Sequence, residues 1–238
     1  MSTNKAHPNL ELIAVTPELV PAWAATQSPS FILPSEYDKE HKSFTWAIFP
    51  NGFTEEVTAH RIKGYHEALS TPNMHFFLIR DVTSQEYVGV SRWLIHPHPE
   101  PFDEAAEIAQ SENEYLTAEN VPGINRAALR MLRIAQAKAK AKYLGDRAFV
   151  YLWILGTIEA AQGKGVGVFG LQWGMDKARE LDIPVYLDSG ENAVGFYEKQ
   201  GFKQLGMLDY DARQVGFHSR AGFVAMIWEP SWEKGTGS

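Results

Sequence analysis

The sequence YLWILGTIEAAQGKGVGVFGLQWGMDKARELDIPVYLD, from Tyr151 to Asp188, decides the fold. It begins within an apolar run, AFVYLWIL, of the kind expected for a strand that is buried on both faces of a sheet. A Gly-rich loop follows and leads directly into a helical pattern from about Gly165 to Leu181, after which IPVYL predicts a second short strand. Because the N-terminus of a helix offers free N–H groups to anions, we ask which phosphate group such a loop could bind.

Two common phosphate-binding motifs fit the loop poorly. A Walker loop, G-x-x-x-x-G-K-[ST], fails because the Gly-Lys pair at 163–164 is followed by Gly165 and lacks the earlier glycine. A dinucleotide fingerprint, G-x-G-x-x-G, fits Gly165, Gly167 and Gly170, and Asp188 ends the next strand where a ribose-binding acid would lie. However, the residues TIEAAQGK separate the strand from the first glycine, and the motif begins late in the chain. A nucleotide-dependent oxidoreductase is therefore the weaker alternative, and a Gly-rich turn without a ligand is another.

The hexapeptide QGKGVG matches a third pattern, Q/R-x-x-G-x-G/A, and resembles the acetyl-CoA loop of GNAT N-acetyltransferases. In this loop, small residues let successive backbone N–H groups converge on a pyrophosphate, and the following helix N-terminus adds its dipole. Hydrogen bonds to charged groups contribute about 1.5–3 kcal/mol each, so several can hold a large polyanion. The residues that the resemblance assigns to acetyl-CoA are Gln162, Gly163, Lys164, Gly165, Val166 and Gly167.

A second motif resembles the same family. The sequence GFYEKQGF, Gly195 to Phe202, is similar to the (L/F)YEKxGF pattern that follows the cofactor loop in GNAT proteins. FPNGF, EYVGVSRW and YLWILGT also resemble fungal-type members, so the resemblance covers most of residues 10–229. It implies an α/β fold with a mixed, largely antiparallel central sheet flanked by helices. We expect a single N-acetyltransferase domain over residues 1–238.

The resemblance also implies a reaction, in which an amine attacks the thioester of acetyl-CoA directly, without a covalent enzyme intermediate. Tyr197 matches the tyrosine that the family places near the cofactor sulfur, where a protonated phenol can donate to the leaving thiolate. Packing against neighbouring aromatic rings is the alternative role for this residue. The backbone of Leu155, Gly156 and Thr157 is expected to pair with the pantetheine arm, and Asn192 is also assigned to cofactor binding.

The residue that removes a proton from the acceptor ammonium is left open by the sequence. A lysine-like ammonium has a pKa of about 10.4 and must lose a proton before it can attack. His96, His98, Glu100 and Asp188 are candidates because each lies near the end of a predicted strand. The tract HPHPEP resembles a metal site superficially, but no other ligand spacing supports one, and we expect no metal.

Two departures from the family pattern favour an alternative function. The loop has Ala160 and Ala161 where the family usually has P-x-(aromatic or His)-Q, and Gly190 stands where the family often has Asn or Ser. Neither change removes backbone amides, but both could weaken the positioning of a cofactor. The alternative is a degenerate GNAT-like protein that binds CoA or a protein partner without turnover.

The rest of the chain predicts one α/β domain without a clear linker. Helices are expected over 54–70 and 125–144, and the AKAKAK of the second should form a solvated face. The acidic segment 97–124 is expected to be an insertion, either a mobile excursion or a lid, and residues 28–53 should be irregular. Both segments are expected to shape the acceptor site. Residues 231–238 form a tail.

Composition narrows the choice of partners. The chain has 22 Lys and Arg against 29 Asp and Glu, a net charge of −7, which disfavours nucleic-acid binding. The same charge suits a cationic amine of a small molecule or peptide. We expect no membrane partner, because no stretch is long and apolar enough to span a bilayer. The lack of cysteine and of a signal-peptide pattern predicts a cytoplasmic protein, or alternatively a nuclear one. Oligomeric state and the identity of the amine are not predicted.

Overall fold

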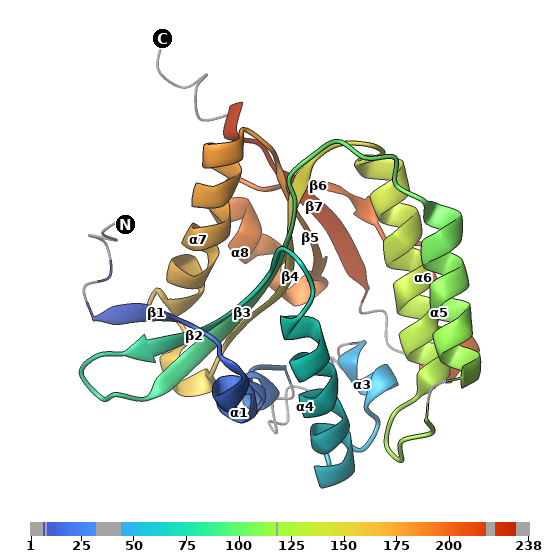
Figure 1. The fold of residues 1–238 in the computed structure, drawn as a ribbon, viewed down its shortest axis with the longest axis horizontal. Coiled ribbons are helices and arrows are strands. Elements are labelled where there is room, and N and C mark those ends of the chain that lie inside the picture. Colours follow the sequence, from blue (N-terminus) through green and yellow to red (C-terminus); the bar gives the residue numbers. More distant parts are fainter. Residues whose placement is uncertain (1–6, 8, 32–43, 118, 218–221, 232–238) are drawn as a thin grey trace.

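A seven-stranded sheet forms the centre of the part of the chain that the structure describes (Figure 1). The computed structural model describes residues 7, 9–31, 44–117, 119–217 and 222–231. The strand order is β1-β2-β3-β4-β5-β7-β6, and neighbours are antiparallel except for the parallel pair β4 and β5. The predicted mixed, largely antiparallel sheet is therefore confirmed. The strands are β1 (Leu10–Ala14), β2 (Met74–Asp81), β3 (Tyr87–His96), β4 (Phe149–Thr157), β5 (Val185–Gly190), β6 (Lys203–Met207) and β7 (Phe223–Trp228).

Helices cover both faces of this sheet (Figure 1). One face, which we call the α7 face, carries α7 and α8. The opposite face, which we call the α4–α6 face, carries α1, α3, α4 and α6, with α5 packed along α6. The α-helices are α1 (Val20–Phe31), α3 (Thr45–Ile48), α4 (Glu55–Leu69), α5 (Glu104–Thr117), α6 (Arg126–Tyr143), α7 (Val166–Leu181) and α8 (Val194–Lys199). Short 3₁₀ turns are η1 (Pro17–Leu19), η2 (Glu159–Ala161), η3 (Glu191–Ala193) and η4 (Ala212–Val215).

Local capping residues set the starts of the two predicted helices. The side chain of Thr54 accepts a hydrogen bond from the N–H of Val57, and that of Asn125 accepts one from Ala128. Such N-caps satisfy donors that a first helical turn leaves free. The helices expected over 54–70 and 125–144 are confirmed as α4 and α6.

The acidic segment 97–124 is more regular than an excursion, because residues 104–117 of it form α5. This helix packs against α6, and carboxylates along it form ion pairs with basic side chains of α6. Each such pair is at least partly exposed to solvent, so these ion pairs attach α5 at the surface of the protein. The pairs are Glu107 with Lys140, Glu112 with Arg130, and Glu114 with Arg133.

Two further expectations need correction. Within 28–53, residues 28–31 end α1 and residues 45–48 form α3, so this segment is partly helical; residues 32–43 lie outside the described part. The AKAKAK sequence is not simply a solvated face, since Ala137 and Ala139 are buried. Residues 232–238 of the predicted tail also lie outside the described part. No helix among the described residues is both long and apolar enough to cross a membrane.

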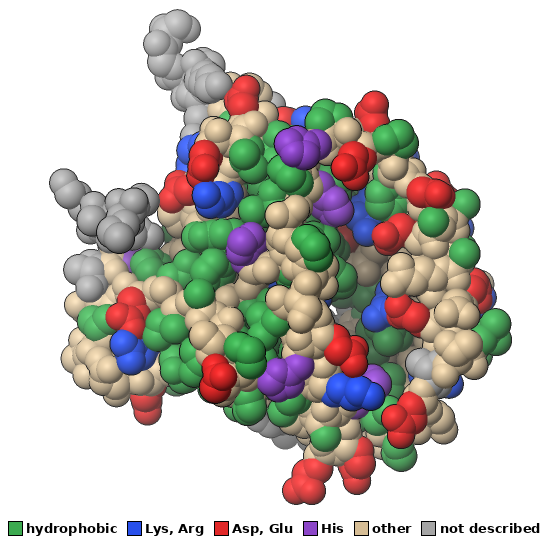
Figure 2. Space-filling model, viewed as in Figure 1, with side chains coloured by type: hydrophobic (Ala, Val, Ile, Leu, Met, Phe, Trp, Pro, Cys, Tyr) green, Lys and Arg blue, Asp and Glu red, His purple; other side chains and the backbone are tan. Residues whose placement is uncertain are grey.

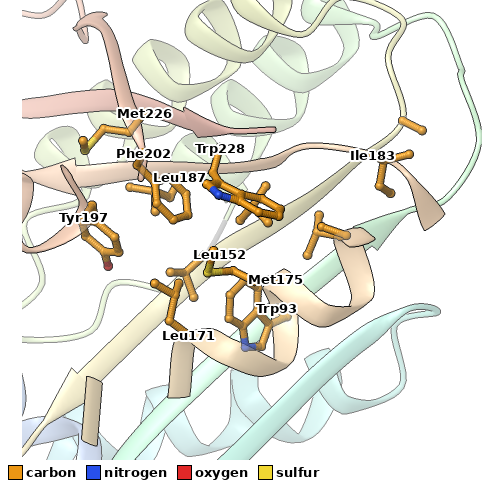
Figure 3. Packing of buried hydrophobic residues seen from close by; sticks show 14 of the residues in the cluster. Trp93, Leu152, Leu171, Met175, Ile183, Leu187, Tyr197, Phe202, Met226 and Trp228 are labelled. Atoms are coloured by element: carbon orange, nitrogen blue, oxygen red, sulfur yellow. The ribbon is translucent and has the colours of Figure 1, made fainter. Parts of the chain in front are cut away.

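The core beneath α7 fixes the position of this helix on the sheet (Figure 3). Trp93 of β3 is fully buried and lies against Gly174 of α7, where an added Cβ would come within 2.1 Å of the indole ring. Leu152, Leu171 and Met175 fill the surrounding space. Because no larger residue fits at position 174, α7 packs closely on β3 and β4, and its N-terminus is held beside the end of β4.

Candidate active site

The strands β4 and β5 separate after only three residue pairs, the last of which joins Leu152 to Leu187. Beyond this pair, β4 is paired only with β3, and β5 only with β7. Among the described residues, the facing edges of 153–157 and 188–190 therefore lack a strand partner. We call this place the β4–β5 opening. An unpaired strand edge presents N–H and C=O groups that an extended ligand can pair with, and 155–157 lie on it.

The Gly-rich loop connects the end of β4 to α7. Gly163 and Gly165 have φ angles of 74° and 83°, in the left-handed region that favours glycine. Gly165 is the N-cap of α7, and no side chain of the described residues caps the helix. Residues 162–164 are exposed. The first N–H groups of α7 thus lie at an exposed loop without a side-chain acceptor, an arrangement suited to an anion.

Three elements meet at the first turn of α7. A Cβ added at Gly167 would lie 3.2 Å from Cζ of Phe196 in α8 and 3.8 Å from Oγ1 of Thr157 at the end of β4. The structure therefore brings together the Gly-rich loop, the end of the unpaired β4 edge and the second sequence motif. These were separate in the sequence.

His7 also lies at the loop, although the sequence did not indicate it. A Cβ at Gly165 would come within 2.3 Å of the His7 imidazole, which also makes an edge contact with Phe169 at 6.3 Å between ring centroids. Because His7 lies far from the loop in the sequence, no local sequence pattern predicts this contact.

Side chains around the loop are packed in a way that accounts for part of the departure from the family pattern. Ala161 is buried and packs with Val166 and Phe169. Leu155 packs against α7, since a Cβ at Gly170 would lie 2.9 Å from its Cδ1. The small residue at 161 therefore contributes to the core under the loop, and the side chain of Leu155 is a core contact.

Tyr197 is buried in α8, where it makes edge contacts with Phe196 and Phe202 at 5.0 and 5.6 Å between ring centroids. Figure 3 shows its hydroxyl directed away from Phe202 and Leu187. No described residue forms a hydrogen bond with this hydroxyl, and burial raises its pKa, so the phenol stays protonated at neutral pH. Both roles considered for Tyr197, aromatic packing and proton donation, are compatible with this position.

Asp188 lies at the other side of the β4–β5 opening, on the α4–α6 face. Its carboxylate accepts hydrogen bonds from the hydroxyls of Tyr151 at 2.9 Å and Tyr186 at 2.8 Å, and from Nε2 of Gln136 at 3.3 Å. Desolvation by burial nevertheless raises the pKa of Asp188, and its negative charge in turn helps raise those of the two tyrosines. A buried carboxylate with a raised pKa is a stronger base than an exposed one.

Tyr151 and Gln136 are parts of this network that sequence reasoning missed. Tyr151 lies in an apolar strand, and its hydroxyl needs a partner once the strand is buried. That requirement could have indicated a polar neighbour, but not which one. Gln136 lies on the helix expected to be an ordinary surface helix, and only the packing of α6 on the sheet brings it to Asp188.

The other three candidate bases lie elsewhere. His96, His98 and Glu100 line a separate cavity of about 220 Å³, where His96 stacks on Phe149 at 4.4 Å between ring centroids. His96 pairs with Phe149 in the sheet, at the opposite end of β4 from Leu155, which is about 20 Å away at 3.3–3.4 Å per residue. Among the described residues, no group of three or more His, Asp or Glu is placed to hold a metal ion.

Asn192 is exposed in η3, between β5 and α8. A Cβ at Gly190 would lie 2.9 Å from its Oδ1, so a larger residue at position 190 would require Asn192 to move. The glycine that departs from the family pattern therefore lies directly beside the asparagine assigned to the cofactor.

Comparison with known proteins agrees with this geometry. Residues 39–202, more than half of the chain, match the acetyltransferase (GNAT) family. A relative named "Probable acyltransferase SID5" from Ajellomyces capsulatus is 30% identical over 80 residues, which cover 30% of this chain and 59% of the relative. The match thus spans less than two thirds of that relative.

Solved structures with the same fold include three that are similar over nearly their whole length. The C-terminal condensation domain of Ebony, in complex with beta-alanyl-dopamine, has a TM-score of 0.65 at 11% identity and covers 92% of this chain and 98% of its own. Mosquito arylalkylamine N-acetyltransferase like 5b has a TM-score of 0.59 at 15% identity, with 92% and 99% covered. A histone acetyltransferase HPA2 and related acetyltransferase from Corynebacterium glutamicum has a TM-score of 0.55 at 18% identity, with 93% and 97% covered. Together with the family match, the loop and the β4–β5 opening show that the chain belongs to the acetyltransferase (GNAT) family.

Proposed function

We propose that the protein is an N-acetyltransferase that moves an acetyl group from acetyl-CoA to a primary amine of a small molecule or peptide by direct attack. The observation that carries the proposal is the convergence of the uncapped start of α7, the unpaired edge of β4 and the buried Tyr197 on one opening in the sheet. The names of the Ebony domain and the mosquito relative support an amine as the acceptor.

In this proposal, acetyl-CoA lies in the β4–β5 opening. The backbone N–H groups within 162–167 that remain free bind its pyrophosphate, aided by the dipole of α7. The N–H groups of Gln162 and Lys164 already donate to the carbonyls of Glu159 and Ala161. The backbone of Leu155, Gly156 and Thr157 pairs with the pantetheine arm as an added strand would, because this edge of β4 is otherwise unpaired. Asn192 at the start of α8 belongs to the same proposed cofactor site.

The two proposed proton-transfer groups approach the opening from opposite faces of the sheet. Tyr197 belongs to the core of the α7 face, whereas Asp188 is bonded to Tyr151 and Tyr186 on the α4–α6 face. Acetyl-CoA supplies the acetyl group as a thioester. Asp188 takes a proton from the acceptor ammonium, the amine nitrogen forms a bond to the carbonyl carbon, and the carbon–sulfur bond breaks. Tyr197 then donates its hydroxyl proton to the departing thiolate, and the second proton that the nitrogen loses as the amide forms returns to the Tyr197 oxygen. Asp188 releases its proton to solvent.

The test measures both binding and turnover. Calorimetric titration with acetyl-CoA should give one saturable site, and release of free CoA should accelerate when a suitable primary amine is added. Binding of acetyl-CoA without turnover over a broad panel of amines would overturn the enzyme proposal in favour of the degenerate alternative. Binding of NADH with no binding of acetyl-CoA would favour the oxidoreductase alternative instead. The intracellular location predicted from the sequence stays a prediction.

A further inference from the structure

Arg92 on β3 lies in an unusual environment for a charged side chain. Its guanidinium carbon lies 4.2 Å from the ring centroid of Trp153 and 4.8 Å from that of Phe76, and its Nε donates to Sδ of Met74 at 3.3 Å. These contacts hold the head group between two aromatic rings on the α4–α6 face. They leave both terminal nitrogens of the guanidinium without a hydrogen-bond acceptor among the described residues.

The charge of Arg92 also lacks a counterion there. Within the described ranges no carboxylate lies within ion-pair distance of Arg92, whereas neighbouring arginines on this side, Arg130 and Arg133, are paired with glutamates of α5. Burial, together with the nearby charge of Arg133, lowers the pKa of Arg92 to about 10. A partly buried cation without a counterion is unfavourable, and a planar guanidinium fork fits a carboxylate with two parallel hydrogen bonds.

The position of Arg92 relates it to the β4–β5 opening. Trp153, the ring on which Arg92 lies, is the first residue of β4 beyond the last pair with β5, and it is 43% exposed. Its ring is 5.6 Å from that of Tyr151, whose hydroxyl is bonded to Asp188. The α4–α6 face therefore carries, in succession, the guanidinium of Arg92, the exposed ring of Trp153 and the carboxylate of Asp188.

The surface of the α4–α6 face is hollowed between α4 and the α5–α6 pair, as Figure 2 shows. A cavity of about 110 Å³ lies in this region, lined by His60 of α4 and by Arg126, Arg130 and Arg133 of α6, together with Glu114 and Glu119. Arg133, which lines this cavity, is also one of the groups whose charge lowers the pKa of Arg92.

We propose that the amine acceptor itself carries a carboxylate, and that Arg92 binds this carboxylate while the amine lies over Trp153 toward Asp188. This inference rests on the proposed acetyl transfer and names the class of its acceptor, an amino-carboxylate compound. It also reverses the expectation drawn from net charge, because the −7 of the whole chain does not describe the local surroundings of Arg92.

The test compares matched acceptors that differ only in the carboxylate: γ-aminobutyrate with n-butylamine, L-lysine with its decarboxylated diamine, and L-phenylalanine with phenethylamine. In the wild-type protein, kcat/KM should favour the carboxylate member of at least one pair by tenfold or more, as expected for about 1.5–3 kcal/mol from a hydrogen bond to a charged group. The substitution Arg92→Met should remove that preference, because it should lower kcat/KM for the carboxylate member at least tenfold more than for the simple amine. Arg92→Lys should retain part of the preference for the carboxylate member.

Arg80→Met is the matched control, because Arg80 is paired with Glu11 on β1 and lies away from the opening. It should leave the preference intact. An equal loss for both members of a pair in Arg92→Met, or a wild-type preference for the simple amines, would overturn the inference and assign Arg92 to packing. Thermal unfolding of each variant shows whether a loss of kcat/KM comes from reduced stability of the protein.

A binding measurement separates this inference from the proposed function. Saturation-transfer NMR with the same pairs, in the presence of CoA, reports acceptor binding without turnover. Carboxylate members that bind the wild type but not Arg92→Met support the inference even when no acetyl transfer is found, in which case the proposed function alone fails. No binding of any carboxylate member to the wild type overturns the inference while acetylation of simple amines still supports the function.

Discussion

The two faces of the sheet differ in the kind of core they carry. On the α7 face, the polar groups of the buried cluster are isolated: Nε1 of Trp93 and the hydroxyl of Tyr197 have no hydrogen-bond partner among the described residues. On the α4–α6 face, polar groups of Arg92, Gln136, Tyr151 and Asp188 come from four different elements and lie near one another. The faces meet at the β4–β5 opening.

The proposed cofactor site and the proposed acceptor site therefore lie on faces of different chemical character. The apolar face is tightly packed around Trp93 and Gly174, which suits a fixed position for α7 and for a cofactor bound at its start. The α4–α6 face holds charged groups that are partly shielded from solvent, so electrostatic interactions between neighbouring groups are strong. A ligand can supply the counterion that Arg92 lacks. We therefore expect cofactor binding and acceptor selection to be separable by mutation.

The largest effect is expected from Gly165→Glu on the α7 face. The new side chain would have to occupy space now filled by His7, at a φ of 83°, and its charge would oppose a pyrophosphate. Loss of several hydrogen bonds of about 1.5–3 kcal/mol each should lower acetyl-CoA affinity by 100-fold or more, measured by calorimetry.

Gly145→Glu is the matched control for strain and charge. Gly145 also has a positive φ, 58°, but an added Cβ meets no atom within 4 Å, and the residue lies after α6, away from the loop. This control should bind acetyl-CoA normally. Undiminished affinity in Gly165→Glu would contradict the assignment of the loop.

Tyr197→Phe should separate chemistry from binding on the same face. Only the phenolic donor is removed, so kcat should fall by about 100-fold or more while acetyl-CoA affinity stays nearly constant. Stability should change by less than about 0.5 kcal/mol, because the hydroxyl has no partner to lose among the described residues. Steady-state kinetics with Tyr87→Phe as control would test this. Equal kcat in both variants would leave Tyr197 as a packing residue.

Asp188→Asn tests the polar face through pH. Because the folded-state pKa of Asp188 is raised, the folded wild type binds more protons than the unfolded chain between the two pKa values. The contribution of Asp188 to stability is therefore present at low pH and is lost as the pH rises through its folded-state pKa. Relative to Asp188→Asn, the wild type should lose stability with rising pH, measured by denaturant unfolding across the acidic to neutral range.

Asp146→Asn provides the control, because it makes the same change of side chain at an exposed position. A constant stability difference between the wild type and Asp188→Asn at all pH values would contradict the buried, proton-binding state of this carboxyl. If Asp188 accepts the proton of the ammonium, Asp188→Asn should also remove the acidic limb of the plot of reaction rate against pH.

The smallest effect is expected at the outer edge of the polar face. Glu112 accepts two hydrogen bonds from Arg130, at 2.7 and 2.5 Å, but both side chains are 37% exposed. Glu112→Gln should therefore reduce stability by no more than about 1 kcal/mol. The loss should shrink in concentrated salt, as measured by unfolding at low and high ionic strength. A loss of several kcal/mol that is independent of salt would contradict a surface attachment of α5.

The two faces also differ in how far the sequence could predict them. The loop at 162–167 and the motif at 195–202 are short, contiguous and governed by local backbone requirements, so the turn into α7 and the largely antiparallel sheet were predictable. The assignment of the loop to a cofactor stays a prediction. Asp188 could be named only as one of four candidates, because His96 and Asp188 both lie near strand ends, and the register of β4 separates them. No sequence pattern indicated Arg92, since its contacts come from two other strands, β2 and β4.

The central claim, that acetyl-CoA lies along the unpaired edge of β4, is tested most directly by hydrogen–deuterium exchange with and without the ligand. Peptides that cover 153–167 should gain protection on addition of acetyl-CoA, because amides of the free edge and of the loop acquire acceptors. Peptides that cover 150–152, which are already paired on both sides in the sheet, should change little. Binding of acetyl-CoA with no added protection in 153–167 would contradict the claim.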